Sequence, residues 1–171
     1  MYVLRLKKMK KRILVFIISV VLLAHVAKSQ ENIPSIKLKA VSGKIIDLRD
    51  LVANTKDTVL VVSFWATWCM PCIAELDNIN DEFEEQQTLK PFKFYGVAID
   101  DARTTQRVKP FVKGKGWKFD VLMDVNSELK RALNITDVPH VIIFKNGKLV
   151  SRHTGYITGD ENNLFETIKG L

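Results

Sequence analysis

The hydrophobic and polar positions along the chain first suggest a strand, a helix and a second strand in its middle. Residues 58–64 are almost entirely apolar, which is typical of a central strand covered on both faces. Residues 92–100 form a second such run. Between them, over 71–87, apolar residues recur every three or four positions, which predicts an amphipathic helix: Cys72, Leu76, Ile79 and Phe83.

The segments around this unit predict shorter elements. Residues 36–40 and 44–47 alternate weakly around Gly43, which indicates an edge hairpin. We expect a polar link at 50–57 and a helix over 102–113 that is bent or started at Pro110. An extended piece over 119–123 and a short helix over 127–133 should follow. In the sequence, these elements precede and follow the two central strands and the helix between them.

The C-terminal part predicts a hairpin followed by a helix. Residues 141–144 and 149–152 are expected to be strands joined around Asn146-Gly147, a strong turn signal. Thr158 and Glu161 have the spacing of a capping box for a last helix over 160–171, with Leu164, Phe165, Ile168 and Leu171 buried. A parallel strand–helix–strand unit with an added antiparallel hairpin gives a mixed sheet with helices on both faces. The expected fold class is therefore α/β.

Charge and composition narrow the class of protein. The chain has 26 Lys and Arg against 19 Asp and Glu, a net charge of +7, but residues 1–29 hold seven of the bases and no acid. Residues 30–171 are therefore neutral overall, so we expect no nucleic-acid partner. With 47 % apolar residues, the chain is neither disordered nor a polytopic membrane protein. The 142 residues after position 29 suffice for one domain.

The first 29 residues have the three parts of a secretory signal peptide. A basic stretch to Arg12 precedes the apolar segment 13–27, and Ala27-Lys28-Ser29 places small residues before a cut ahead of Gln30. Fifteen helical residues rise about 22 Å, less than the roughly 30 Å hydrocarbon core of a membrane. We expect a cleaved signal at 1–29 and a domain at 30–171, in the periplasm or cell envelope. An uncleaved anchor through 13–27 is the alternative.

The chain has two cysteines, Cys69 and Cys72, placed where a buried strand ends and an amphipathic helix begins. A helix N-terminus favours a thiolate, so Cys69 is the expected exposed nucleophile. Cys72 lies on the buried stripe of the helix, within disulfide reach of Cys69. Pro71 fits the first helical turn, and Met70 adds apolar surface without charge. This spacing predicts a redox pair in which one thiol attacks and the other resolves.

Two plainer interpretations of the pair are weaker. A structural disulfide closing so short a loop constrains the unfolded chain little. A metal site needs about four ligands, whereas only His140 and His153 remain beyond residue 29, with no second cysteine pair. A copper-binding metallochaperone using Cys69, Cys72 and His140 stays open as an alternative function, because soft thiolates suit Cu(I). A non-enzymatic, membrane-tethered interaction module is a second alternative.

The segment 64–72, Phe-Trp-Ala-Thr-Trp-Cys-Met-Pro-Cys, together with the distant Val138-Pro139 and Phe144-Lys145-Asn146-Gly147, resembles the thioredoxin superfamily. The leading hairpin, the export signal, Thr67 and Glu75 make the chain more similar to exported thiol-disulfide reductases of the TlpA and ResA type. The resemblance covers 36–171. It implies a thioredoxin-like fold, a cis peptide before Pro139, and a proline loop that lies against Cys69 and Cys72.

The resemblance also implies roles for single residues. Trp68, Met70, Pro71, Val138 and Pro139 are expected to receive a partner chain, although Trp68, like Trp65 and Trp117, has core packing as its plainer interpretation.

Departures from the thioredoxin pattern raise the question of the proton acceptor. Ser63 stands where cytosolic thioredoxins have a buried aspartate, so Glu75, three residues after Cys72, is the candidate acceptor; its alternative is to complement the helix dipole. His140, which replaces the usual threonine, is expected to be a hydrogen-bonded core residue, and His153 a surface residue.

These observations predict an exported, monomeric thiol-disulfide oxidoreductase with Cys69, Cys72 and Glu75 as catalytic residues. Its partners are expected to be client proteins with cysteines or disulfides, and an electron donor in the membrane or envelope. No cofactor is expected beyond the redox-active disulfide between Cys69 and Cys72, and no metal. Because Met70 and Pro71 bring no cation to hold the thiolate, we expect a reducing couple rather than a strong oxidant.

Overall fold

The computed structural model describes residues 33–171, which belong to one compact unit, Asn32–Leu171. The expected signal peptide at 1–29 lies outside the described residues. No helix within 33–171 has both the length and the apolar character to cross a membrane.

A seven-stranded mixed sheet forms the centre of the unit, in the order β2-β1-β5-β4-β3-β6-β7. The strands β3, β4 and β5 are parallel, and every other pair is antiparallel. The strands are β1 Lys37–Ala40, β2 Ile45–Asp47, β3 Val59–Trp65, β4 Phe92–Ala98, β5 Asp120–Met123, β6 His140–Lys145 and β7 Lys148–Thr154. The mixed α/β sheet expected from the sequence is confirmed, including the N-terminal hairpin.

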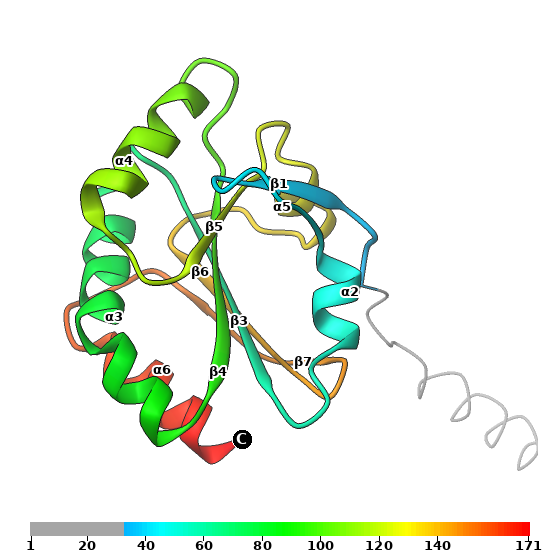
Figure 1. Cartoon of the computed structure of the whole chain (residues 1–171), viewed down its shortest axis with the longest axis vertical. Helices are drawn as coiled ribbons and strands as arrows, with labels where there is room; N and C mark the ends of the chain where they lie inside the picture. Colours follow the sequence, from blue (N-terminus) through cyan, green and yellow to red (C-terminus); the bar gives the residue numbers. More distant parts are fainter. Residues whose placement is uncertain (1–32) are drawn as a thin grey trace, which may run out of the picture. The chain divides into compact units, whose positions relative to one another are not determined.

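Helices cover both faces of this sheet (Figure 1), with α3, α4 and α6 on one side and α2 and α5 on the other. The helices are α2 Leu48–Ala53, α3 Met70–Leu89, α4 Val108–Lys115, α5 Glu128–Ala132 and α6 Asp160–Gly170, with a 3₁₀ turn at Thr105–Arg107 before α4. All seven residues of β3 are buried, as expected of a strand covered on both faces.

An aromatic cluster fills the core beneath α3 and α4. Trp65 packs edge-on against Trp117, and Phe94 lies 4.6 Å from Phe119 between ring centroids. Trp65 and Trp117 are 0 % and 8 % exposed, so their core packing is confirmed. Gly96 on β4 permits the close approach of Trp65, because a Cβ at position 96 would lie 3.2 Å from the indole nitrogen.

Local polar contacts correct three details of the predicted elements. Residues 50–57 are not merely a link, because Asp47 caps α2 by accepting the backbone N–H of Arg49. The helix expected over 102–113 begins only at Val108 and follows a turn held by Asp101. Gly159 is the N-cap residue of α6 and makes no side-chain cap bond, so Thr158 and Glu161 do not form the expected capping box. The last helix also leaves Leu171 37 % exposed.

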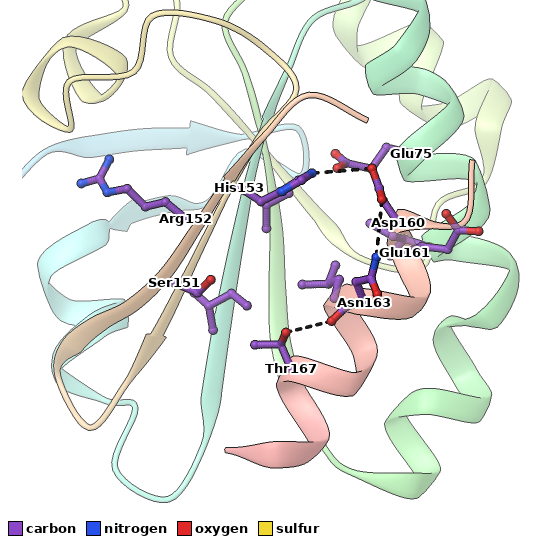
Figure 2. A pocket seen from close by; sticks show the side chains of 12 residues that line it. Glu75, Ser151, Arg152, His153, Asp160, Glu161, Asn163 and Thr167 are labelled. Atoms are coloured by element: carbon purple, nitrogen blue, oxygen red, sulfur yellow. Dashed lines mark hydrogen bonds and ion pairs between the residues drawn. The ribbon is translucent and has the colours of Figure 1, made fainter. Parts of the chain in front are cut away.

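A cavity of about 180 Å³ lies between α3, α6 and the last two strands (Figure 2). Its inner wall includes Glu75 and Ile79 from α3 and Val141 from β6. Its outer wall comes from β7 and α6, including His153 and Thr167. The cavity therefore connects the buried side of α3 with the edge of the sheet.

Candidate active site

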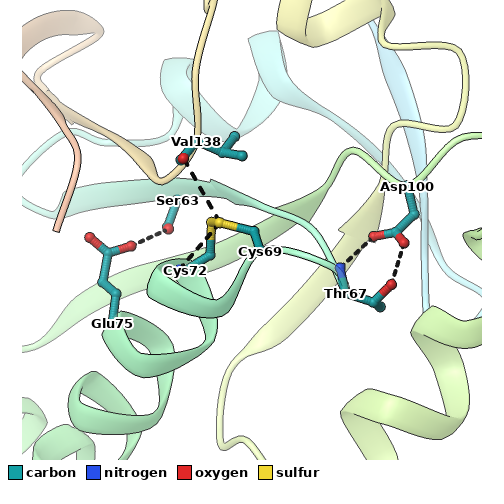
Figure 3. Close-up of a disulfide and its surroundings, with 7 residues drawn as sticks. All are labelled: Ser63, Thr67, Cys69, Cys72, Glu75, Asp100 and Val138. Carbon is teal, nitrogen blue, oxygen red and sulfur yellow. Dashed lines mark hydrogen bonds between the residues drawn. A yellow bond between two sulfur atoms is a disulfide. The ribbon is translucent and has the colours of Figure 1, made fainter.

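The cysteine pair lies at the N-terminus of α3, directly after the central strand β3. Cys69 is the N-cap residue, and its Sγ lies 3.4 Å from the backbone nitrogen of Cys72, which donates to it. Pro71 is in the first helical turn, where its missing N–H costs nothing. A disulfide joins Cys69 and Cys72, whose Cα atoms are 5.3 Å apart (Figure 3). When the disulfide is reduced, the helix N-terminus favours the thiolate of Cys69.

The exposure of the two sulfur-bearing residues differs less than the sequence suggested. Cys72 is fully buried and Cys69 is 6 % exposed, so the expectation of an exposed Cys69 is wrong in degree, although Cys69 is the more accessible of the two. Part of the cover comes from the proline loop, since the carbonyl oxygen of Val138 lies 3.8 Å from Sγ of Cys69. A substrate disulfide must therefore approach Sγ of Cys69 beside this loop.

The proline loop has the expected backbone form. The peptide bond between Val138 and Pro139 is cis. Pro139 is followed at once by β6, which pairs with β3, so the loop lies at the end of β3 where the cysteine helix begins. The carbonyl oxygen of Pro139 accepts the backbone N–H of Gly155, which connects the loop to the end of β7. Cys69 and Val138, which are 69 residues apart in the sequence, thus meet at the disulfide.

Two apolar side chains stand exposed beside the disulfide. Trp68 is 57 % exposed and Met70 is 72 % exposed, although both adjoin the nearly buried Cys69. The plainer interpretation of Trp68 as a core residue is therefore wrong. Exposed aromatic and methionine side chains are suited to receiving an apolar segment of a partner.

Glu75 is buried deeply one turn after Cys72. It is 3 % exposed, and its Oε2 accepts a hydrogen bond of 3.1 Å from Oγ of Ser63 on β3 (Figure 3). Burial raises the pKa of Glu75 to about 7, the bond from Ser63 opposes that rise, and the charges of Asp160 and Glu161 add to it. A carboxyl group with this pKa can both take up and release a proton near neutral pH.

The sequence did not indicate that Ser63 bonds to Glu75, nor the contact between Asp100 and Thr67. The carboxylate of Asp100, 1 % exposed at the end of β4, accepts the backbone N–H of Thr67 at 2.9 Å and also its hydroxyl (Figure 3). Parallel pairing of β3 and β4 brings the two strand ends together, and only the register reveals this. The segment before Cys69 is thereby fixed to the neighbouring strand.

The two histidines lie where the sequence placed them, one in the core and one on the surface. His140 is 8 % exposed, and its Nδ1 lies 2.8 Å from the hydroxyl of Thr154. Burial lowers the pKa of His140, with Arg152 and His153 adding to the effect. His153 is exposed on β7 and lies 3.7 Å from Asp160 between Nε2 and Oδ2. Within residues 33–171 no three His, Cys, Asp or Glu side chains are grouped to hold a metal ion, so the copper-site hypothesis gains no support.

The fold and the disulfide at the helix N-terminus define a thioredoxin-like oxidoreductase. Residues 30–160 match the model of the AhpC/TSA family, and the chain belongs to this family. It is 30 % identical over 132 residues to the thiol-disulfide oxidoreductase ResA of Bacillus cereus, a match that covers 75 % of this chain and 70 % of that protein. The ResA of Bacillus subtilis is also 30 % identical, over 73 % of this chain and 66 % of that protein.

Solved structures agree with this assignment. An uncharacterised thioredoxin-like protein from Porphyromonas gingivalis has a TM-score of 0.70 at 36 % identity, covering 81 % of this chain and 90 % of that one. StoA from Bacillus subtilis has a TM-score of 0.62 at 20 % identity, covering 78 % and 99 %, and shares the fold. The protein is therefore a thiol-disulfide oxidoreductase of the thioredoxin fold.

Proposed function

We propose that the protein reduces disulfides of client proteins outside the cytoplasm. The observation that carries the proposal is the position of Glu75, a buried acid with a pKa near 7, one helical turn from the buried Cys72. Such a group suits the removal of a proton from a resolving thiol. The neutral pair Met70 and Pro71 offers no cation to stabilise the reduced form strongly, which favours a reducing couple.

The proposed cycle begins with the reduced protein. The thiolate of Cys69 attacks one sulfur of a client disulfide, which forms a mixed disulfide and releases the other client sulfur as a thiolate that takes a proton from solvent. Glu75 then accepts the proton of Cys72, whose sulfur attacks Sγ of Cys69. This step forms the disulfide between Cys69 and Cys72 and releases the second client thiol, so the client gains two electrons. A thiol donor in the envelope restores the reduced protein.

The client is proposed to bind across the exposed side chains of Trp68 and Met70, with its backbone beside Val138 and Pro139. The cis-proline loop places the backbone of Val138 beside the disulfide, with its carbonyl oxygen 3.8 Å from Sγ of Cys69, which fits pairing of a client strand with this loop. Such a partner does not need to be charged, because the two exposed side chains beside the disulfide, Trp68 and Met70, are apolar.

A trapping experiment in cells tests the assignment of the two thiols. In Cys72→Ser, Cys69 can still attack but nothing resolves the product, so mixed disulfides accumulate on non-reducing gels. In Cys69→Ser they do not. Reduction of insulin under dithiothreitol is the activity control, and an interaction module without redox function would show no turnover. Equal trapping by both variants would overturn the assignment.

Export is proposed from the N-terminal sequence. A basic stretch, the apolar segment 13–27 and the small residues before Gln30 have the order of a signal peptide. The intact mass of the protein from its native host should correspond to a chain that begins at Gln30. A mass that retains residues 1–29 in the membrane fraction would instead show an anchor, and recovery from the cytoplasm would contradict export.

A further inference from the structure

The cavity described above reaches Glu75 from the edge of the sheet that β7 forms. Glu75 and Ile79 belong to its buried inner wall, whereas His153, Asn163 and Thr167 in its outer wall are exposed. Glu75 thus borders the turn of α3 that carries Cys72 and also a space that opens at the edge of the sheet. The mechanism above uses the carboxyl group but not this space.

Several charged or titratable groups lie on the elements packed around Glu75. They are Cys72 on its own helix, Asp160 and Glu161 on α6, Arg152 and His153 on β7, and Tyr156 in the loop between β7 and α6.

Two of these groups have their charged or polar atoms engaged elsewhere. Oε2 of Glu161 accepts the hydroxyl of Tyr156 at 2.7 Å and the backbone N–H of Gly159 at 3.0 Å. The guanidinium of Arg152 donates to the carbonyl oxygen of Leu133 and points away from Glu75 (Figure 2).

Asp160 and His153 stand together in the cavity wall near Glu75 (Figure 2). Their Oδ2 and Nε2 atoms are 3.7 Å apart, and His153 carries a charge only when it is protonated. Asp160 is held in place from two directions, because its Oδ2 accepts the backbone N–H of Ile157 and its Oδ1 the side-chain amide of Asn163. A fixed carboxylate therefore faces a buried carboxyl group across the cavity.

We propose that this cavity is the proton route between Glu75 and solvent, and that Asp160, paired with His153, is a positioning residue that controls when Glu75 holds its proton. The proposal rests on the proposed function, in which Glu75 accepts the proton of Cys72. The proton passes from Sγ of Cys72 to a carboxylate oxygen of Glu75, then to water in the cavity and to a base in solvent. Glu75 is left ionised again, and no electron crosses the cavity.

The size and the lining of the cavity suit this role. A space of about 180 Å³ has room for several waters. Ser151, Asn163 and Thr167 supply polar groups along its wall. Like-charge repulsion from Asp160 favours the protonated form of Glu75, and a positive charge on His153 weakens that repulsion. After burial, the charge of Asp160 is the largest cause that raises the pKa of Glu75.

Titration of Glu75 in the oxidised protein tests the control by Asp160. The side-chain carboxyl carbon of Glu75, followed by ¹³C NMR, should titrate near pH 7 in the wild type. The midpoint should be lower in Asp160→Asn, because this substitution removes a negative charge that raises the pKa of Glu75. Glu166→Gln, at an exposed position on α6 outside the cavity, is the matched control and should leave the midpoint unchanged. An unchanged midpoint in Asp160→Asn would overturn the control by this residue.

Filling the cavity tests the route. Ser151→Leu and Thr167→Leu place apolar side chains in its wall, and stopped-flow reduction of a model disulfide should show resolution by Cys72 roughly tenfold slower, with the attack by Cys69 unchanged. Asn162→Leu, exposed on α6 outside the cavity, should match the wild type. If Glu75→Gln slows resolution but neither cavity-filling variant does, the proton route is wrong and the proposed function stands. If Glu75→Gln resolves at the wild-type rate, the role of Glu75 in the proposed function fails first.

Discussion

Ser63 on the central strand donates its hydroxyl to Glu75, which lies in the second turn of the helix that begins at the cysteine pair. Both residues are buried, with exposed fractions of 0 % and 3 %. A single hydroxyl offsets only part of the cost of burying a carboxylate. Burial and this hydrogen bond together leave the pKa of Glu75 at about 7, above that of an ordinary glutamate but low enough for the group to ionise near neutral pH. Ser63 therefore adjusts the acid to the pH range in which proton transfer is reversible.

Replacing Ser63 tests this balance. Ser63→Ala removes the hydrogen bond that lowers the pKa of Glu75, so that pKa should rise above its present value of about 7. The ¹³C signal of the Glu75 carboxyl group reports it directly. Thr88→Ala removes a hydroxyl from the exposed part of the same helix and serves as the control. A midpoint in Ser63→Ala equal to that of the wild type would show that the bond does not stabilise the carboxylate.

The raised pKa of Glu75 also predicts how stability depends on pH. The folded protein holds this proton up to about pH 7, whereas the unfolded chain releases it near 4.5, so the group costs stability as pH rises through this window. Glu75→Gln removes that cost. The variant should gain stability over the wild type by up to about 3 kcal/mol at pH 8, and little at pH 4.

Urea unfolding of the oxidised proteins at both pH values gives this difference. Comparing variant with wild type at each pH cancels the contributions of the other carboxyl groups, which are common to both proteins. A gain that is equal at pH 4 and pH 8 would mean that Glu75 does not titrate in this window.

Much of the fold followed from local patterns in the sequence. The continuous apolar run of β3, the helical periodicity after Pro71 and the turn at Asn146-Gly147 each depend on neighbouring residues, and each was confirmed. Helix α2 was missed because only six residues form it, and because its cap, Asp47, is also the last residue of strand β2. Short elements depend on single side-chain contacts, which periodicity does not reveal.

The sequence predicted the site residues that belong to recognisable motifs. It did not predict the contacts that depend on the register between strands. Cys69, Cys72 and the cis-proline were identified from motifs. The bond between Asp100 and Thr67 joins residues 33 apart, and it requires the parallel register of β3 and β4. The cavity beyond Glu75 depends on how α6 lies over β7, which no local pattern specifies.

The bond between Asp100 and Thr67 leads to a third prediction. Asp100→Ala leaves the backbone N–H of Thr67 without its partner, which should cost about 1–3 kcal/mol of stability. The loop before Cys69 should also lose its fixed position, so the equilibrium of the disulfide with a dithiothreitol buffer should change. Urea unfolding and redox titration measure the two effects.

Asp101→Ala is the matched control for Asp100→Ala. Asp101 is the next residue, and its partners Arg103 and Thr104 lie outside the site, so its loss should weaken the turn before α4 but leave the redox equilibrium at the wild-type value. If Asp100→Ala loses stability but keeps the wild-type redox equilibrium, Asp100 supports the fold without positioning the cysteine segment.

The exposed side chains beside the disulfide lead to a last prediction, which separates client binding from thiol chemistry. Trp68 is 57 % exposed, so its side chain contributes little to the stability of the free protein. A protein client can cover it, whereas a small disulfide reaches Cys69 without contact. Trp68→Ser should therefore lower kcat/KM for insulin reduction by about tenfold and leave the reduction of a small aromatic disulfide near the wild-type rate.

Leu89→Ser is the control for this substitution, because Leu89 is 60 % exposed at the C-terminal end of α3, whereas the disulfide lies at the N-terminal end. It loses a similar apolar surface far from the disulfide and should reduce both substrates at the wild-type rate. Met70→Ser removes the second exposed side chain and should act on insulin in the same direction as Trp68→Ser. Equal losses on the protein and the small disulfide would show that Trp68 acts on the cysteines themselves, and no loss on either would place the client elsewhere.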